Sequence, residues 1–214
     1  NVHLFGLYNK APKLNIPVIG DACQYLDKTE NELFTAYSFQ ASKIITTVDG
    51  GALVCKRKKD YKRAKLLRWY GMERNKDVMD VDIKEAGYKY HMNDVTASLG
   101  IVGLKDLKKL KREREKLQEC YSENLEEVTP IGGSPYLIYT ENRDKLKKEL
   151  LKHGVETGLV HRRNDLYSVF GGRRQNLPRM DWLEDSYLFL PCHNKMTTKD
   201  VLKICKIINK YAAT

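Results

Sequence analysis

The sequence contains no long apolar segment. No stretch without charged residues approaches the roughly 20 residues that a membrane-spanning helix needs, and the chain shows no charged start followed by an apolar core, the pattern of a secretory signal. We therefore expect no membrane partner and a cytoplasmic location.

Paired spacing is also missing among the residues that form disulfides or bind metals. The five cysteines and the five histidines are scattered along the chain, whereas disulfide frameworks and zinc sites use closely spaced pairs. We expect free thiols, as in a reducing cytoplasm, and no metal site. The cysteines are Cys23, Cys55, Cys120, Cys192 and Cys205.

Acidic residues are fewer than basic ones, 28 against 38, which gives a net charge of +10. A basic balance is typical of nucleic-acid binding but also suits a ligand that carries a diphosphate. Much of the charge lies in residues 105–116, where Leu107, Leu110, Leu117 and Tyr121 recur at helical spacing. The charges therefore indicate the solvated face of one amphipathic helix. Because no helix-turn-helix, zinc finger or aromatic stacking pattern accompanies them, we expect no nucleic-acid partner.

A single lysine, Lys43, stands in the segment 38–51, which ends in Asp49-Gly50-Gly51. An amine presented by such a loop can form a Schiff base if burial or a neighbouring cation disfavours its ammonium form. The ordinary alternative is a solvated surface charge, since lysine is rarely buried.

Upstream, residues 16–24 form an apolar run that reaches a carboxylate at Asp21. The run predicts a buried strand with Asp21 at its carboxyl end, which is where ligands gather in open α/β sheets. A carboxylate beside the nitrogen of pyridoxal phosphate keeps that ring an electron sink. The alternative for Asp21 is a helix cap or turn residue.

These segments, and several others, resemble the DegT/DnrJ/EryC1/StrS family of pyridoxal-phosphate sugar aminotransferases. The lysine segment is the most specific match, and the similarity extends over essentially the whole chain. The matching segments are residues 2–6, 18–24, 38–51, Leu67-Arg68 with Gly71, 87–94, 97–100, 161–165 and 188–191.

The resemblance implies a cofactor site. Lys43 would bind pyridoxal 5'-phosphate covalently and later move the proton at the substrate carbon, and Asp21 would pair with the pyridinium nitrogen. Gln24 would lie near the 3'-oxygen of the cofactor, and Ser38 would donate its hydroxyl to the phosphate. A hydroxyl suits phosphate oxygens, and an amide donates without adding charge. Lys43 also argues against the family's dehydratase branch, in which histidine replaces the lysine.

Two departures from the family pattern affect the expected site. Gly20 stands where the family usually has a glutamate, so a carboxylate next to Asp21 is missing. Lys89 stands where many members have an asparagine that reaches the phosphate of the neighbouring subunit, and His91 replaces an arginine. We expect Lys89 to act as a point charge toward the phosphate, in a homodimer that the resemblance implies.

The family resemblance begins at what would be a middle strand, since the sequence starts at Asn1. We expect a partial chain without the turn and helix N-terminus that hold the phosphate, and little or no activity from this polypeptide alone. The function implied is transfer of an amino group from an amino acid donor, such as glutamate, to a keto group of a nucleotide-linked deoxysugar. The alternative is an inactive remnant that acts as a binding or regulatory partner.

The expected fold is α/β, of the fold-type I aminotransferase class. Residues 1–112 would form a partial large domain with a mixed sheet, and residues 113–214 a small α+β domain. In the small domain, His161, Arg162 and Arg163 are candidate substrate contacts because a guanidinium can clamp a carboxylate or phosphate. The alternative for these arginines is a surface loop paired with Asp165.

Local patterns predict the individual elements. Gly132-Gly133-Ser134 is expected to form a turn without a strand before it, and Thr197 with Asp200 matches a capping box. A polar loop is expected to run through Pro178. The expected strands are 1–5, 16–20, 51–56, 136–139 and 187–190, and the expected helices are 60–70, 93–126, 143–153 and one after Thr197.

Overall fold

The computed structural model describes residues 1–212. The chain divides into two compact units, Asn1–Lys108 and Lys109–Thr214. The dividing point lies within the long helix α2 (Asp94–Asn124), and the boundary predicted between residues 112 and 113 falls in the same helix. Each unit is described separately below.

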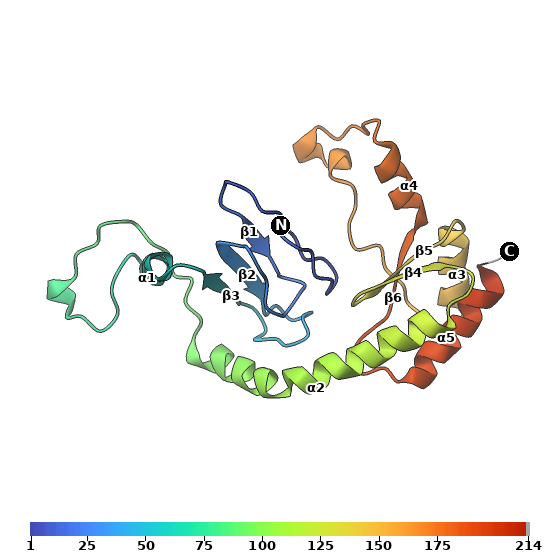
Figure 1. The fold of residues 1–214 in the computed structure, drawn as a ribbon, viewed down its shortest axis with the longest axis horizontal. Helices are drawn as coiled ribbons and strands as arrows, with labels where there is room; N and C mark the ends of the chain where they lie inside the picture. Colours follow the sequence, from blue (N-terminus) through green and yellow to red (C-terminus); the bar gives the residue numbers. More distant parts are fainter. Residues whose placement is uncertain (213–214) are drawn as a thin grey trace. The chain divides into compact units, whose positions relative to one another are not determined.

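The first unit is built on a three-stranded mixed sheet, as expected for the large domain (Figure 1). The strands β1 (Ile19–Asp21) and β2 (Phe34–Ser38) are parallel, and β2 is antiparallel to β3 (Gly51–Cys55). Ser38 pairs with Gly51, so the segment that carries Lys43 leaves β2 and enters β3 at one edge of the sheet.

The strand predictions for this unit were partly wrong. The strand β3 is confirmed, whereas β1 begins three residues later than the predicted 16–20. The predicted strand 1–5 is reduced to one bridge between Val2 and Asp21. The central strand β2 was not predicted, although Phe34, Thr35 and Tyr37 favour strands. The run is only five residues long, and its pairing with β1 and β3 is not visible in the local sequence.

Helix positions were predicted more closely. The helix α1 (Lys58–Leu67) ends before Tyr70 and Gly71, which both have positive φ angles of 56° and 80°. The helix α2 begins as expected, because the Asn93 side chain accepts a hydrogen bond from the Thr96 amide at 3.0 Å. A short 3₁₀ helix, η1 (Val78–Asp80), lies between them.

The second unit contains an antiparallel sheet in the order β4 (Thr129–Gly132), β5 (Tyr136–Tyr139) and β6 (Tyr187–Leu190). The predictions of β5 and β6 are confirmed. The strand β4 was not predicted, and the expectation that no strand leads into the Gly132-Gly133 turn was wrong. The helices are α3 (Arg143–Lys152), α4 (Pro178–Ser186) and α5 (Thr198–Tyr211), with 3₁₀ turns η2 (Asn164–Leu166) and η3 (Ser168–Phe170). Helix α4 was also missed, although proline at its first position is a recognised start signal.

The second unit has a well-formed apolar core. The capping box of Thr197 and Asp200 is confirmed, and it starts α5 so that one face of the helix packs inward. Leu146 and Leu150 of α3 meet that face. The other main core residues are Leu117, Tyr121, Tyr136, Ile138, Leu188, Leu190, Val201, Ile204 and Ile208.

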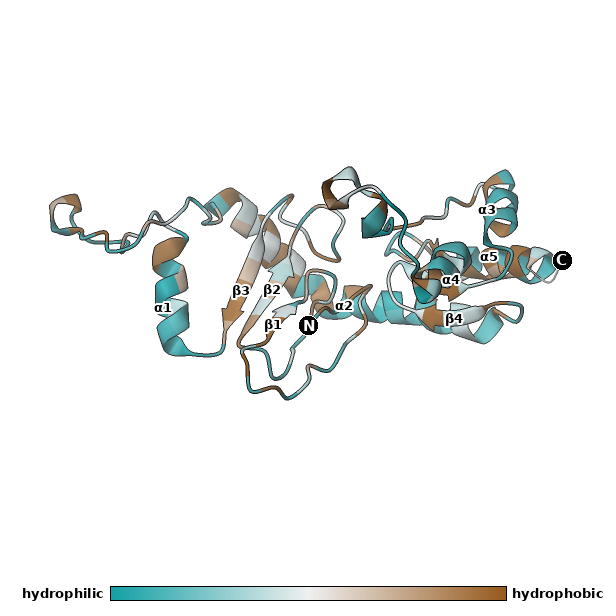
Figure 2. Cartoon of the chain, turned by 90° about the horizontal axis from the view of Figure 1, so that it is seen from above, coloured by the Kyte–Doolittle hydropathy of each residue, from teal (hydrophilic) through white to brown (hydrophobic). Residues whose placement is uncertain are grey.

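Buried apolar side chains are few in the first unit. Ala11, Ala22 and Ile45 are the ones below one-tenth exposure there, while Leu53 and Val54 of β3 are half exposed. Figure 2 shows this strand as a strongly apolar segment. Among the helices of residues 1–212, none is both long and apolar enough to cross a membrane.

Candidate active site

Lys43 lies on a closed loop between β2 and β3. The loop is tied across its base, since the Phe39 amide donates to the Gly50 carbonyl and the Thr47 amide donates to the Phe39 carbonyl, both at 2.9 Å. The turn also requires glycine at two positions: Gly50 has a φ of 117°, and a Cβ on Gly51 would lie 2.4 Å from the Tyr37 carbonyl oxygen. The two hydrogen bonds therefore constrain the loop that carries Lys43.

The same loop is seated on α2. Ile45 and Thr47 are buried, and both lie against glycines of the helix. A Cβ on Gly100 would be 2.9 Å from Thr47 Cγ2, and a Cβ on Gly103 would be 3.0 Å from Ile45 Cβ. The glycines thus permit the close approach of the loop that carries Lys43. The sequence analysis did not identify Gly103. Two glycines three residues apart in a helix nevertheless indicate close packing at that face, because each glycine weakens the helix.

Asp21 lies at the carboxyl end of β1 and is held as an anion. Its Oδ1 accepts a hydrogen bond from the Cys23 amide at 3.0 Å. That bond, together with the Cys23 side chain and the positive charge of Lys43, lowers the pKa of the Asp21 carboxyl. Lys43 therefore lies close enough to act electrostatically on Asp21, even though the two residues are far apart in sequence.

Cys23 responds to both charges. Burial, followed by the hydrogen bond and negative charge of Asp21, raises the pKa of the Cys23 thiol to about 11, while the charge of Lys43 acts in the opposite direction. This thiol is consequently a natural reporter of the Asp21 and Lys43 geometry.

Gln24 and Ser38 complete the group predicted in the first unit. The Gln24 Oε1 accepts from the Phe5 amide at 3.0 Å, which leaves its NH₂ group as the available donor. Ser38 ends β2, and its Oγ accepts from the Gln40 amide at 3.3 Å. Because β1 and β2 are parallel, the ends of both strands lie at one edge of the sheet.

Lys89 is not joined to this group. It is exposed and forms an isolated bridge with Trp69, and within residues 1–212 no hydrogen bond or ion pair links it to Lys43, Asp21, Gln24 or Ser38.

Arg163 in the second unit is buried and fully engaged. Its Nε and Nη2 contact the two Asp165 oxygens at 2.8 and 2.6 Å, it also contacts Asp181, and it donates to the Gln175 carbonyl at 3.0 Å. The Arg163 guanidinium holds the pKa of the Asp165 carboxyl well below its usual range. Arg163 is therefore paired with Asp165, as in the alternative, but its side chain is buried rather than part of a solvated surface and has no exposed donor face for a substrate.

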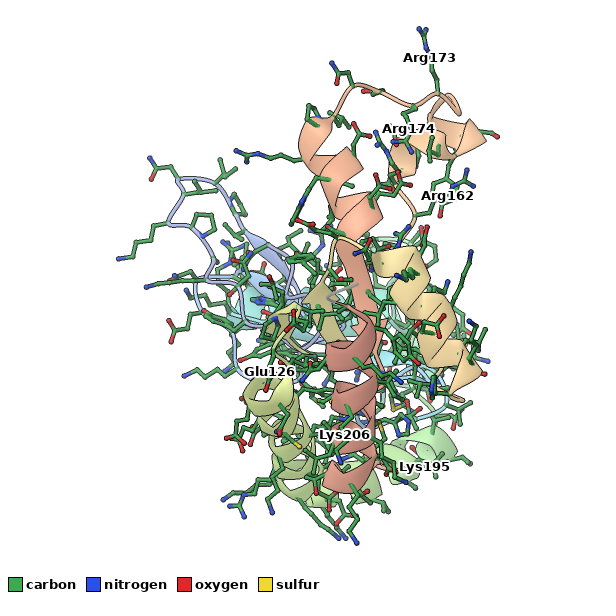
Figure 3. All side chains as sticks on the ribbon, turned by 90° about the vertical axis from the view of Figure 1, so that its right-hand side faces the viewer. Glu126, Arg162, Arg173, Arg174, Lys195 and Lys206 are labelled. Atoms are coloured by element: carbon green, nitrogen blue, oxygen red, sulfur yellow. The ribbon has the colours of Figure 1, made fainter. Side chains whose placement is uncertain are left out.

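The other two candidates of that segment differ from Arg163. Arg162 is exposed, with its guanidinium 5.5 Å from the centre of the Tyr167 ring. Figure 3 shows Arg162 and Arg173 on the outside of the segment, whereas Arg174 is directed toward α4, where it pairs with Glu184 at 2.6 Å. The His161 carbonyl accepts a hydrogen bond from the Tyr187 hydroxyl.

Comparison of the sequence with known protein families identifies the class of protein to which this fold and the Lys43 loop belong. A sequence profile described as the DegT/DnrJ/EryC1/StrS aminotransferase family matches residues 6–209. The chain belongs to this family.

Individual relatives agree with this assignment. The chain is 30% identical, over 94% of its length, to the UDP-4-amino-4,6-dideoxy-N-acetyl-beta-L-altrosamine transaminase of Campylobacter jejuni strain 81-176. Among solved structures it matches AtS13 from Actinomadura melliaura over 98% of the chain with 25% identity and a TM-score of 0.86. It matches the sugar aminotransferase CalS13 from Micromonospora echinospora over 91% of the chain with 26% identity and a TM-score of 0.80. The chain spans 60%, 65% and 58% of these three proteins, respectively.

The residues present fit pyridoxal phosphate, the cofactor of the family. An anionic carboxylate, an amine, an amide donor and a hydroxyl match the ring nitrogen, aldehyde, 3'-oxygen and phosphate of that molecule. The observation that supports the fit is the placement of the ionised Asp21 carboxyl at the carboxyl end of β1, at the same edge of the sheet as Ser38, because an ionised carboxyl keeps a pyridine nitrogen protonated.

Proposed function

We propose that this protein takes part in pyridoxal-phosphate-dependent transfer of an amino group from an amino acid donor, glutamate, to a keto group of a nucleotide-linked deoxysugar. The observation that carries the proposal is the position of Lys43, on a constrained loop and within electrostatic reach of the ionised Asp21. The similarity to a nucleotide-sugar transaminase supports the substrate class.

The side chains have distinct tasks. Asp21 would bind the protonated ring nitrogen, Ser38 would donate its hydroxyl to the phosphate, and the Gln24 NH₂ group would donate to the 3'-oxygen. Lys43 would hold the cofactor covalently and, as a free amine, would move the proton at the substrate carbon. When bound, pyridoxal phosphate supplies an electron sink for the charge that develops at that carbon.

The substrate contacts belong to the exposed part of the second unit. Arg162 is the guanidinium we assign to the carboxylate of the donor or a phosphate of the sugar nucleotide, with His161 beside it, since Arg163 is occupied by Asp165 and Asp181. Arginine suits either anion because its planar fork binds two oxygens.

Assembly as a homodimer is part of the proposal. Support comes from apolar side chains that the first unit exposes on α2 and on the segment before it, since large exposed apolar areas mark interaction surfaces. These residues are Tyr88, Tyr90, Val95, Leu99 and Val102, each 47% exposed or more. Lys89 lies in the same segment, in keeping with a contact to the phosphate of the neighbouring subunit.

The test is selective covalent binding of pyridoxal phosphate. The purified chain is incubated with the cofactor, reduced with borohydride and digested, and the modified lysine is identified by mass spectrometry. We expect modification at Lys43, its loss in Lys43→Ala, and no change in the control Lys105→Ala, which alters an exposed lysine of α2. Modification spread evenly over surface lysines, or absent from Lys43, would refute the proposal and favour a non-catalytic binding protein.

The donor is tested separately by release of 2-oxoglutarate. Protein that has been incubated with pyridoxal phosphate, and not treated with borohydride, is mixed with glutamate. The 2-oxoglutarate released is then measured for the wild type and for Arg162→Ala. Sustained turnover is not expected from this polypeptide alone, so the measurement is one round of release per modified chain. We expect this release to need Lys43 and to require more glutamate in Arg162→Ala.

A further inference from the structure

A buried pair of ionisable side chains, His3 and Glu32, lies in the first unit and has no part in the proposed chemistry. Both side chains are fully buried, and His3 Nε2 lies 3.3 Å from Glu32 Oε1. Buried ionisable groups are costly unless they are paired. The pair therefore needs a role that outweighs this cost.

The surroundings of His3 fix its orientation. Its Nδ1 accepts a hydrogen bond from the Asn9 amide at 3.1 Å, so the ring proton lies on Nε2. Nε2 is within 3.3 Å of Glu32 Oε1 but forms no hydrogen bond of regular geometry among residues 1–212. The ring is stacked between Tyr8 and Tyr25, with centroids 5.3 and 5.4 Å away.

Glu32 is held as the anionic partner. Its Oε1 also accepts from the Asn1 side chain at 2.9 Å, whereas Oε2 is buried without a hydrogen-bond partner among residues 1–212. Burial alone raises the pKa of the Glu32 carboxyl, but hydrogen bonds from the Asn1 side chain, the Glu32 amide and the Thr29 side chain outweigh it, so the pKa is lowered.

Gly20 provides the space that the Glu32 side chain occupies. A Cβ on Gly20 would lie 2.8 Å from Glu32 Cγ and 3.4 Å from Cδ. Val2 bridges Asp21 in the parallel sense, so alternation along the strands puts His3 and Gly20 on one face and Asp21 on the other. A side chain at position 20 would thus enter the space where Glu32 now meets His3.

The segment anchored by His3 also holds two residues of the proposed cofactor site. The His3 amide donates to the Asp21 carbonyl at 2.9 Å, and the Phe5 amide donates to Gln24 Oε1 at 3.0 Å. A displacement of residues 3–5 would therefore move both Asp21 and Gln24.

We propose that positions 20 and 32 are coupled: Glu32 supplies the carboxylate that pairs with His3, Gly20 leaves room for it, and the pair positions Asp21 and Gln24. Glu32 is a positioning residue, since it contacts neither Asp21 nor the proposed cofactor. The part of this inference that concerns cofactor positioning rests on the proposed function, whereas the coupling of the two positions does not.

The test is a double-mutant cycle that moves the carboxylate from one position to the other. Gly20→Glu places two side chains in one space, Glu32→Ala leaves His3 without its partner, and the double variant restores a single carboxylate. Glu32→Gln keeps the side-chain shape and removes its charge. The measurements are the urea midpoint of unfolding and the alkylation rate of Cys23, whose thiol reports the position of Asp21.

We expect both single variants and Glu32→Gln to lower the urea midpoint, and the double variant to recover most of the loss. The coupling should change the folding equilibrium about fivefold or more, as for residues in direct contact. Loss of the anchor should weaken the bond between Asp21 and the Cys23 amide, so Cys23 should react about threefold faster in Glu32→Ala and return toward the wild-type rate in the double variant.

Additive effects of the two single changes would overturn the coupling. If Glu32→Ala is unfolded and the double variant is folded, the coupling is supported. If both of these variants are unfolded, the coupling is refuted. A lower midpoint in Glu32→Ala with an unchanged Cys23 rate would show a structural pair without a positioning role. Both readouts are independent of pyridoxal phosphate, so failure of cofactor binding is distinguishable from failure of this inference.

Discussion

The reactivity of Cys23 tests the geometry of the candidate site without any cofactor. Its thiol pKa is raised to about 11, first by burial and then by Asp21, and is held down by Lys43. Removing the carboxylate should therefore lower this pKa, and removing the lysine should raise it. Only a site in which both side chains lie near Cys23 gives these opposite signs.

The size of the effect follows from the thiolate fraction. At pH 8, a thiol with a pKa of about 11 is ~0.1% thiolate, against ~24% for an unperturbed cysteine with a pKa of about 8.5. A more basic thiolate is also more nucleophilic, with a Brønsted slope of about 0.45, which recovers roughly tenfold of this difference. Cys23 should consequently react about 20-fold more slowly than an unperturbed thiol.

The variants are Asp21→Asn and Lys43→Met, which keep side-chain size while removing charge. Each pKa unit changes the alkylation rate about 3.5-fold at this slope. We expect Asp21→Asn to react about 3.5-fold faster if the pKa falls by about one unit, and Lys43→Met to react more slowly than the wild type. The assay is timed alkylation with isotope-coded iodoacetamide, read for each cysteine by peptide mass spectrometry.

Cys55 serves as the internal control in the same samples. Its thiol pKa is raised by burial and by Asp60, without a contribution from Asp21 or Lys43, so its rate should not change in either variant. General loosening of the fold would speed up both cysteines in both variants. An equal acceleration of Cys23 in Asp21→Asn and Lys43→Met would therefore refute the site geometry.

Three further predictions concern the second unit. Leu150→Ala should lower the free energy of unfolding by about 2–5 kcal/mol, because Leu150 is fully buried, whereas the exposed Leu151→Ala should change it by less than about 0.5 kcal/mol in urea titrations. Thr197→Ala should cost about 1 kcal/mol in the same titrations, since it removes the capping box of α5. The pKa of Asp165 is depressed by Arg163, so its contribution is present above the unfolded-state value of about 3.9 and is lost at lower pH; the thermal midpoint of Asp165→Asn should fall less steeply below about pH 4 than that of the wild type.

Local sequence signals identified the elements that local interactions build. The start of α2 at Asn93 and the capping box of α5 could be predicted because each cap is formed by residues within one helical turn. The strand β2 and the bridge at Val2 could not, because their extent is set by partners distant in the chain. The same distinction explains Arg163: its pairing with Asp165 was open to prediction, whereas its contact with Asp181 depends on the unpredicted helix α4.

The candidate site was found through residue types and order, but its geometry depends on contacts that no local pattern contains. A lysine before an Asp-Gly-Gly turn suggests an amine at the mouth of a site, yet the loop is closed by the backbone hydrogen bonds of Phe39. It also lies against α2, where Gly103 leaves room for Ile45. Gly20 shows the limit most clearly. From the sequence, Gly20 marks a position where a carboxylate expected from the family pattern is missing. In the structure, the absence of a side chain at Gly20 leaves room for the carboxylate of Glu32, twelve positions later. The absence of a side chain at one position can therefore be required by a residue on another segment. The double-mutant cycle at Gly20 and Glu32 measures how much this requirement contributes to the free energy of unfolding.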